Sequence, residues 1–213
     1  MPADVVPAPA EALPALAAVA ARAFHDELPY SALFPDEPTR AQKLLAWFRL
    51  ALPGAMSAGF LVEMTPAQQG MAMWSPPDHQ DSRWAQLRSA PRLLPQLLAV
   101  LRVTDRADRR RALGWGRRIE QRDLELIPEP HWSLDGLAVD PDQQRRGYGA
   151  ALVRHGLRRA DTSGLATYLE TNSPGNVEFY RKLGFDVIEH IAEDYPPMRI
   201  PAWRMVRPAQ NRD

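Results

Sequence analysis

Residues 137–152 have the composition of an anion-binding loop. They read Leu-Ala-Val-Asp-Pro-Asp-Gln-Gln-Arg-Arg-Gly-Tyr-Gly-Ala-Ala-Leu. The apolar residues up to Val139 predict the end of a strand, and those after Gly149 predict the first turns of a helix. At a helix N-terminus, backbone N–H groups converge on one point and the helix dipole favours negative charge. Because Gly147 and Gly149 lack a Cβ atom, a pyrophosphate can approach this backbone closely, and the two preceding arginines add positive charge.

Two widespread phosphate-binding motifs do not fit these residues. A Walker loop ends in Gly-Lys followed by Ser or Thr, whereas Gly149 is followed by two alanines. The dinucleotide fingerprint needs a third glycine where this chain has Leu152. The segment therefore predicts a pyrophosphate-binding loop of another kind.

A second pattern lies downstream, in residues 169–185. They read Leu-Glu-Thr-Asn-Ser-Pro-Gly-Asn-Val-Glu-Phe-Tyr-Arg-Lys-Leu-Gly-Phe. The pattern Gln-x-x-Gly-x-Gly at residues 144–149 resembles the acetyl-CoA pyrophosphate loop of the GNAT superfamily of acetyltransferases. Residues 169–185 resemble the strand, loop and helix of that superfamily, which ends in Phe-Tyr-x-x-Leu-Gly-Phe. The two motifs stand in the family's order and cover about residues 131–190. Residues 73–77, Met-Trp-Ser-Pro-Pro, further resemble the puromycin N-acetyltransferase branch.

The resemblance implies where acetyl-CoA binds. In this superfamily a bulge splays the fourth strand from the fifth, and the pantetheine arm lies in the gap. The N–H of Leu137 would then polarise the thioester carbonyl, and Val139 would hold a pantetheine amide. The implied cofactor-binding residues are Leu137, Ala138, Val139, Gln144, Arg145, Arg146, Gly147, Tyr148, Gly149, Ala150, Asn172, Asn176 and Tyr180. The resemblance implies acetyl-CoA as co-substrate and no metal.

The resemblance also implies catalytic roles. Tyr180 matches the family's tyrosine near the sulfur, which can protonate the departing thiolate. Many members carry an asparagine seven residues earlier, where this chain has Ser173. Two asparagines flank this position. We expect Asn176 to contact coenzyme A, with Asn172 as the second choice. Either could equally be a turn or helix-cap residue.

The general base is less directly indicated. Strand alternation places Ser133, Asp135 and Leu137 on one face, so Asp135 is one pleat from the residue that polarises the carbonyl. Asp135 is the predicted base, and its alternative interpretation is a hydrogen-bonded residue at a strand edge. The segment around His25, Glu27, Asp26 and Tyr30 resembles the family's acceptor-side loop, and we expect Asp26 and Tyr30 to bind a cationic acceptor.

The elements that position these residues follow from hydrophobic periodicity. The expected helices are residues 10–24, 39–52, 91–101, 106–126, 147–160 and 177–183. The expected strands are residues 60–64, 71–74, 132–139, 165–170, 185–190 and a final edge strand at 203–206. We expect Pro53-Gly54 to end the second helix.

These elements predict a single α/β domain over residues 1–213. The resemblance implies the GNAT acyl-CoA N-acyltransferase fold, with a central mixed, mostly antiparallel, twisted sheet that is splayed between strands 4 and 5 and flanked by helices. Residues 131–190 would form the acetyl-CoA-binding core, and residues 76–130 a helical insertion.

The composition excludes several classes of site. There are 26 Lys and Arg residues against 26 Asp and Glu, and no cysteine, so disulfides, thiolate metal sites and cysteine nucleophiles are absent. The arginines of residues 106–118 alternate with acids, which is typical of a solvated helix, and we expect no nucleic-acid or membrane partner. Residues 1–24 lack the basic start and unbroken apolar run of a signal peptide. We therefore expect a cytoplasmic protein.

The function predicted from these observations is transfer of acetyl from acetyl-CoA directly to a primary amine in a ternary complex. The favoured acceptor is a small molecule, such as an amine-bearing antibiotic. A protein or peptide amine is the alternative within the same enzyme class. A non-catalytic acyl-CoA-binding sensor is the alternative from another class. The oligomeric state stays open, with a homodimer as one option.

Overall fold

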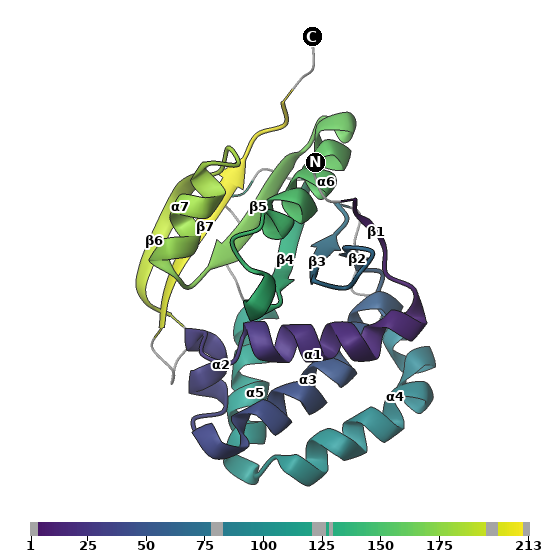
Figure 1. Cartoon of the computed structure of the whole chain (residues 1–213). Coiled ribbons are helices and arrows are strands. Elements are labelled where there is room, and N and C mark those ends of the chain that lie inside the picture. The colour runs from purple at the N-terminus through teal and green to yellow at the C-terminus, as the bar shows by residue number, and fades with distance from the viewer. Residues whose placement is uncertain (1–3, 78–82, 121–126, 128–129, 195–199, 211–213) are drawn as a thin grey trace.

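Seven strands form one sheet in the order β1-β2-β3-β4-β5-β7-β6 (Figure 1). The computed structural model describes residues 4–77, 83–120, 127, 130–194 and 200–210. The strands are β1 (Val6–Pro7), β2 (Leu61–Met64), β3 (Gly70–Ser75), β4 (His131–Val139), β5 (Ala166–Thr171), β6 (Asp186–Asp194) and β7 (Ile200–Arg207). Only β4 and β5 pair in parallel among the described strands. The predicted mixed, mostly antiparallel sheet is confirmed.

Helices cover both faces of this sheet. They are α1 (Leu13–Ala23), α2 (Leu28–Leu33), α3 (Glu37–Ser57), α4 (Arg83–Val103), α5 (Arg106–Glu120), α6 (Tyr148–Ser163) and α7 (Pro174–Arg181), with 3-10 turns at Ala10–Ala12 and Pro141–Gln143. One core cluster joins α1, α2 and α3 to β2 and β3, and includes Leu16, Leu44 and Met71. The other lies under α6 and α7 and includes Leu152 and Leu169. Burial of each such side chain contributes about 1.5–3 kcal/mol, so the sheet is held from both sides.

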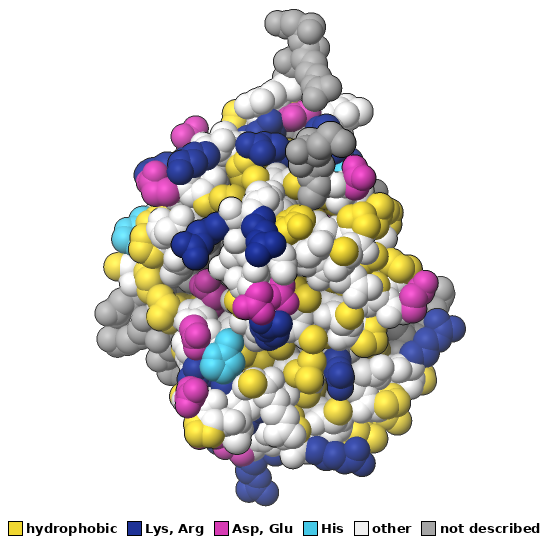
Figure 2. Space-filling view, viewed as in Figure 1, with side chains coloured by type: hydrophobic (Ala, Val, Ile, Leu, Met, Phe, Trp, Pro, Cys, Tyr) yellow, Lys and Arg dark blue, Asp and Glu magenta, His cyan; other side chains and the backbone are white. Residues whose placement is uncertain are grey.

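Charges are mixed on the surface. Figure 2 shows Lys and Arg side chains next to Asp and Glu side chains over this face. This mixture agrees with the equal totals of basic and acidic residues in the chain.

A bulge interrupts β4 at Asp135. Met73 of β3 lies opposite Gly136, but the next residue, Trp74, lies opposite Leu134. Asp135 is thus the extra residue on β4, and such a bulge bends its strand and breaks the ladder locally. The parallel pairing with β5 ends at Leu134. The predicted splay between the fourth and fifth strands is confirmed.

The bulge also changes which side chains share a face. Leu134, Leu137 and Val139 all pack against the cluster under α6 and α7. In a regular strand, Leu134 and Leu137 would point to opposite faces. Asp135 instead accepts a hydrogen bond from the Ser75 hydroxyl at 2.7 Å. The prediction that Asp135 and Leu137 share a face is therefore wrong, because alternation counted along the sequence omits the bulge.

Two helix boundaries and the place of the last strand in the sheet differ clearly from expectation. Helix α3 continues through Pro53 to Ser57, because buried Leu52 and half-buried Met56 keep this turn packed against the core despite the lost backbone N–H. Helix α4 likewise contains Pro91 and Pro95, and begins before the expected residue 91. The last strand, β7, pairs with both β5 and β6, so it is not at the edge. Of the helix expected over 106–126, residues 121–126 lie outside the described residues.

The contact between α6 and β3 depends on Gly156. A Cβ atom at this position would lie 2.2 Å from the indole carbons of Trp74, which is completely buried. We expect Gly156→Ala to lower the free energy of unfolding by about 1–3 kcal/mol or more through overpacking. Urea unfolding would measure the loss.

A matched control is Gly114→Ala in α5. A Cβ atom there would meet nothing within 4 Å, and alanine favours the helix by about 1 kcal/mol over glycine. Equal effects of the two substitutions would contradict the packing argument.

Candidate active site

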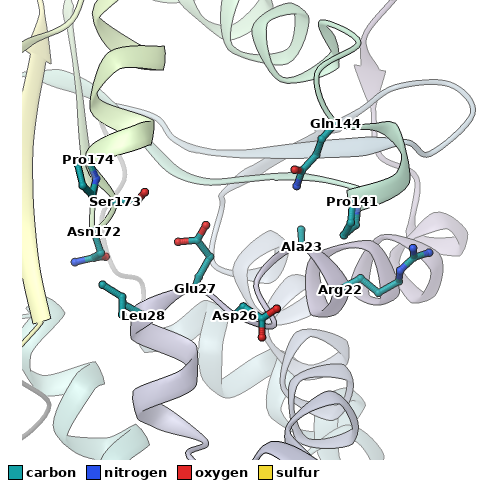
Figure 3. Close-up of a pocket in the computed structure, with 10 residues that line it drawn as sticks. All are labelled: Arg22, Ala23, Asp26, Glu27, Leu28, Pro141, Gln144, Asn172, Ser173 and Pro174. Carbon is teal, nitrogen blue, oxygen red and sulfur yellow. The ribbon is translucent and has the colours of Figure 1, made fainter.

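A cleft of about 430 Å³ lies where the C-terminal ends of β4 and β5 separate. Three segments form its walls: the end of α1 with the loop after it, the turn after β4, and the residues that join β5 to α7. The lining residues are Arg22, Ala23, Asp26, Glu27, Leu28, Pro141, Gln144, Asn172, Ser173 and Pro174 (Figure 3). The bulge in β4 and this cleft are thus parts of one arrangement, in which the loss of strand pairing leaves room for a ligand.

An open cradle of backbone lies beside the cleft. Arg145 and Gly147 have positive φ angles of 60° and 88°, and α6 begins at Tyr148. The first helical bond of α6 runs from the N–H of Ala151 to the carbonyl of Gly147 at 3.0 Å. The N–H groups just before Ala151 therefore precede the helical ladder and point out of the helix end. A Cβ atom at Gly147 would meet nothing within 4 Å, so the cradle has space for an anion.

Gly149 ties this cradle to the end of β4. A Cβ atom there would lie 3.6 Å from Val139 and Phe179, and 3.8 Å from Leu137. The start of α6 therefore packs directly over Leu137 and Val139, the two positions expected to contact the thioester and pantetheine. These residues fit acetyl-CoA: the cradle for its pyrophosphate and the gap beside β4 for its pantetheine arm.

Tyr180 lies on α7 and belongs to the core cluster under α6 and α7. Its side chain is 8% exposed, and its ring packs against Phe179 and Phe185 with centroids 5.0 and 5.8 Å away. Burial raises the pKa of the Tyr180 hydroxyl above its ordinary value, and the negative charge of Glu27 raises it further. The hydroxyl therefore keeps its proton at neutral pH, as a general acid must.

Glu27 points its carboxylate into the cleft from the loop after α1 (Figure 3). Burial raises the pKa of this carboxyl group above its ordinary value. Its charge in turn raises the pKa values of both Tyr30 and Tyr180, although burial is the larger cause for each. Glu27 is thus a half-buried acid whose charge reaches the predicted general acid. Within His25-Asp26-Glu27 the sequence gives no signal for which carboxylate points inward.

The other predicted acceptor-side residues lie around Glu27 in different ways. Asp26 lines the cleft but is 88% exposed, and it contacts His25 at 2.7 Å. Tyr30 packs in an aromatic cluster, with its ring 5.0 Å from Phe24 and 5.1 Å from Trp115. Tyr30 therefore packs the loop after α1 against this aromatic cluster, and it is not among the residues that line the cleft.

The predicted base, Asp135, lies away from the cleft lining. Its carboxylate is exposed and holds Ser75 across the β3–β4 ladder at the bulge. This position matches the alternative interpretation of Asp135 as a hydrogen-bonded residue in the strand.

The two asparagines differ in position. Asn172 lines the cleft, and its amide donates a hydrogen bond to the carbonyl of Pro201 at 2.7 Å, which ties the end of β5 to β7. Asn176 lies in the first turn of α7, where its N–H donates to the carbonyl of Ser173 at 3.1 Å. Asn172 is thus the asparagine nearer to the cleft.

A family model described as the acetyltransferase (GNAT) family matches residues 68–185. This match covers the cradle, the splayed strands and Tyr180. The chain belongs to the GNAT family. The predicted resemblance and fold class are therefore confirmed, and membership supports an acetyl-CoA-dependent N-acetyltransferase. The narrower resemblance to the puromycin branch stays a prediction.

Individual relatives agree with this assignment. The peptidyl-lysine N-acetyltransferase YjaB of Salmonella typhimurium is 33% identical over 72 residues, which is 32% of this chain and 48% of that protein. The aligned part thus spans about half of the relative. Among solved structures, a histone acetyltransferase HPA2-related protein from Corynebacterium glutamicum superposes with a TM-score of 0.67 and 23% identity over 100% of this chain and 99% of the other. Arylalkylamine N-acetyltransferase 2 from Aedes aegypti superposes with a TM-score of 0.60 and 12% identity, over 97% of this chain and 99% of the other. These structural likenesses show the fold.

The described residues contain neither a cluster of metal-binding side chains nor a helix that could cross a membrane. In that part of the chain, no three His, Asp or Glu side chains come together in a way that could hold a metal ion. None of the helices there combines the length and apolarity that a membrane span requires.

The two ends of α6 allow a direct test of the cradle. Gly147 precedes the helix and Gly164 follows it, both with positive φ and with open space where a Cβ atom would go. Alanine at either position should cost about 1–2 kcal/mol of stability, because L-residues disfavour this backbone region. We expect Gly147→Ala alone to weaken acetyl-CoA binding, measured by calorimetry. An equal loss of affinity in Gly164→Ala would show that the effect is not local to the cradle.

Proposed function

We propose that this chain transfers acetyl from acetyl-CoA directly to the primary amine of a small molecule, within a ternary complex. The observation that carries the proposal is that Glu27 lines the cleft between the splayed strands and lies close enough to the buried Tyr180 for its charge to raise the pKa of the Tyr180 hydroxyl. One group is a carboxylate that can accept a proton from an amine. The other is a buried hydroxyl that can donate a proton to a thiolate. The anion cradle at the adjacent helix end fits the other half of acetyl-CoA.

The proposed reaction moves two protons in opposite directions. The amine nitrogen forms a bond to the acetyl carbonyl carbon, and the carbon–sulfur bond breaks. The ammonium first loses one proton to solvent, and the neutral amine attacks. The second nitrogen proton then passes to Glu27, directly or through one water, while Tyr180 gives its proton to the departing sulfur. Glu27 then returns a proton to Tyr180, so both groups regain their starting state.

The raised pKa of Glu27 suits this role. An alkyl ammonium has an ordinary pKa near ~10, so the acceptor must lose a proton before it attacks. A carboxylate whose pKa lies closer to neutrality is a stronger base than an exposed one. Its negative charge also attracts the cationic amine into the cleft. The absence of cysteine from the chain supports direct attack, since no thiol is present to carry an acyl group.

A peptide amine is the second candidate acceptor. It is favoured by the YjaB relative, whose name describes a peptidyl-lysine N-acetyltransferase. The non-catalytic sensor is less consistent with the molecule, because simple binding of acyl-CoA requires neither Tyr180 nor Glu27.

Release of coenzyme A distinguishes these three functions. Because the chain has no cysteine, a thiol reagent reports only the released coenzyme A. Acceleration by small primary amines supports the proposal, and acceleration by lysine peptides alone supports the peptide function. Binding of acetyl-CoA without acceleration by any amine would support the sensor.

Tyr180→Phe tests the general acid. Phenylalanine preserves the packing against Phe179 and Phe185, so the fold should be retained. We expect kcat to fall by about 10²–10⁴, as is typical for loss of a proton donor, with little change in acetyl-CoA affinity. Tyr168→Phe removes the hydroxyl of a buried tyrosine that contacts Glu170 within β5, and serves as the control. Unchanged turnover in Tyr180→Phe would refute the assignment.

Glu27→Gln tests the base. Burial raises the pKa of Glu27, so the base is ionised only above that raised value, and the wild-type rate should fall as pH drops through it. Glutamine should lower kcat/KM by about 10²–10⁴ and remove this acidic limb from the pH profile. Asp135→Asn, measured in parallel, tests the competing residue. If Asp135→Asn removed the limb and Glu27→Gln kept it, Asp135 would be the base.

A further inference from the structure

We propose that Arg22 is a positioning residue that couples the acetyl-CoA cradle to the acceptor loop. Arg22 lies in the last turn of α1 and lines the cleft (Figure 3). One guanidinium nitrogen contacts the carboxylate of Asp140 at 3.1 Å, and another contacts Asp142 at 2.6 Å. Both acids belong to the turn between β4 and the cradle. A single side chain therefore bridges the two halves of the site.

The first effect of this bridge is electrostatic. Asp140 and Asp142 lie only a few residues before the cradle that we assign to a pyrophosphate. Two uncompensated carboxylates there would repel the incoming anion, since like charges at such separations interact appreciably even near water. The guanidinium contacts both carboxylates and offsets one of their two negative charges. Arg22 thus allows an acidic turn to lead into an anion site.

The second effect is geometric. The Asp140 end of the bridge is fixed, because its N–H donates to the carbonyl of Gln69 at 2.8 Å and its carboxylate accepts the N–H of Asp142 at 3.0 Å. At the other end, the chain leaves α1 directly after Arg22 and reaches Glu27, whose N–H donates to the carbonyl of Phe24 at 3.3 Å. A fixed Arg22 therefore holds the start of the loop that carries Glu27 against the cofactor half.

The bridge is too exposed to matter for global stability. The Arg22 and Asp142 side chains are 52% and 75% exposed, and ion pairs of this kind contribute little to folding. Removal of Arg22 should therefore change binding and leave the unfolding curve nearly unchanged. Arg181 offers a matched control, because it pairs with Glu178 at the same 2.6 Å and with similar exposure, 53% and 64%.

The test uses Arg22→Ala, Arg22→Ala/Asp142→Asn, Arg22→Lys and Arg181→Ala in the full chain. Calorimetry with acetyl-CoA should show a roughly threefold to tenfold loss of affinity in Arg22→Ala. This loss should shrink at high salt, which screens exposed charges. The added Asp142→Asn should restore most of the affinity, and Arg22→Lys should restore part of it.

The amine arm of the test rests on the proposed function. With a turned-over amine, KM for the amine should rise in Arg22→Ala and stay raised in Arg22→Ala/Asp142→Asn, because the local net charge then equals that of the wild type but the bridge is still missing. The calorimetric arm needs no turnover, so it tests the electrostatic effect even if no amine is acetylated. The proposal is overturned if Arg22→Ala binds acetyl-CoA as tightly as Arg181→Ala does. It is also overturned if the double variant Arg22→Ala/Asp142→Asn recovers neither the affinity for acetyl-CoA nor the wild-type dependence of that affinity on salt. Full recovery of the amine KM in the double variant would refute the geometric effect.

Discussion

The separation of β4 from β5 is the constraint on which the site depends. Parallel strands normally continue their hydrogen bonds to the end of the shorter strand, and here the pairing stops at Leu134 although β5 continues to Thr171. The extra residue at Asp135 bends β4 at this point. Because α6 packs over Leu137 and Val139 beyond the bulge, the position of the cradle depends on the bend in β4. The bulge therefore sets both the width of the gap and the position of the anion site beside it.

Glu27 shows that this site is arranged at some energetic cost. The half-buried Glu27 carboxylate is less stable ionised here than in water, because burial raises its pKa. The same charge also opposes ionisation of Tyr30 and Tyr180, so both hydroxyls stay neutral. A cationic amine that enters the cleft would stabilise the carboxylate. The strain is thus relieved by the acceptor that we propose, which is the behaviour of a binding site rather than of a purely structural acid.

The parts predicted from sequence were those fixed by local chemistry. A helix N-terminus with glycines creates an anion cradle within a few residues, so residues 144–149 could be recognised without the fold. The bulge, in contrast, appears only when β3 is aligned with β4, and it invalidates the alternation that selected Asp135. The position of β7 between β5 and β6 likewise depends on pairing between distant segments. Local pattern has no access to such contacts, which is why the shared face of Asp135 and Leu137 and the edge position of the last strand were predicted wrongly.

The equal totals of acidic and basic residues conceal opposite local needs within one cleft. In the proposed function, the cradle attracts a pyrophosphate and Glu27 attracts an ammonium. Arg22 joins the end of α1 to the turn after β4 within this cleft. In water-exposed surroundings, opposite charges at this range also attract each other and would draw the loop and the cradle into direct contact. Arg22 and the acids of the turn provide an alternative pairing between these regions, with hydrogen bonds of fixed geometry. In our proposal, such pairing fixes the position of the loop that carries Glu27 relative to the cradle.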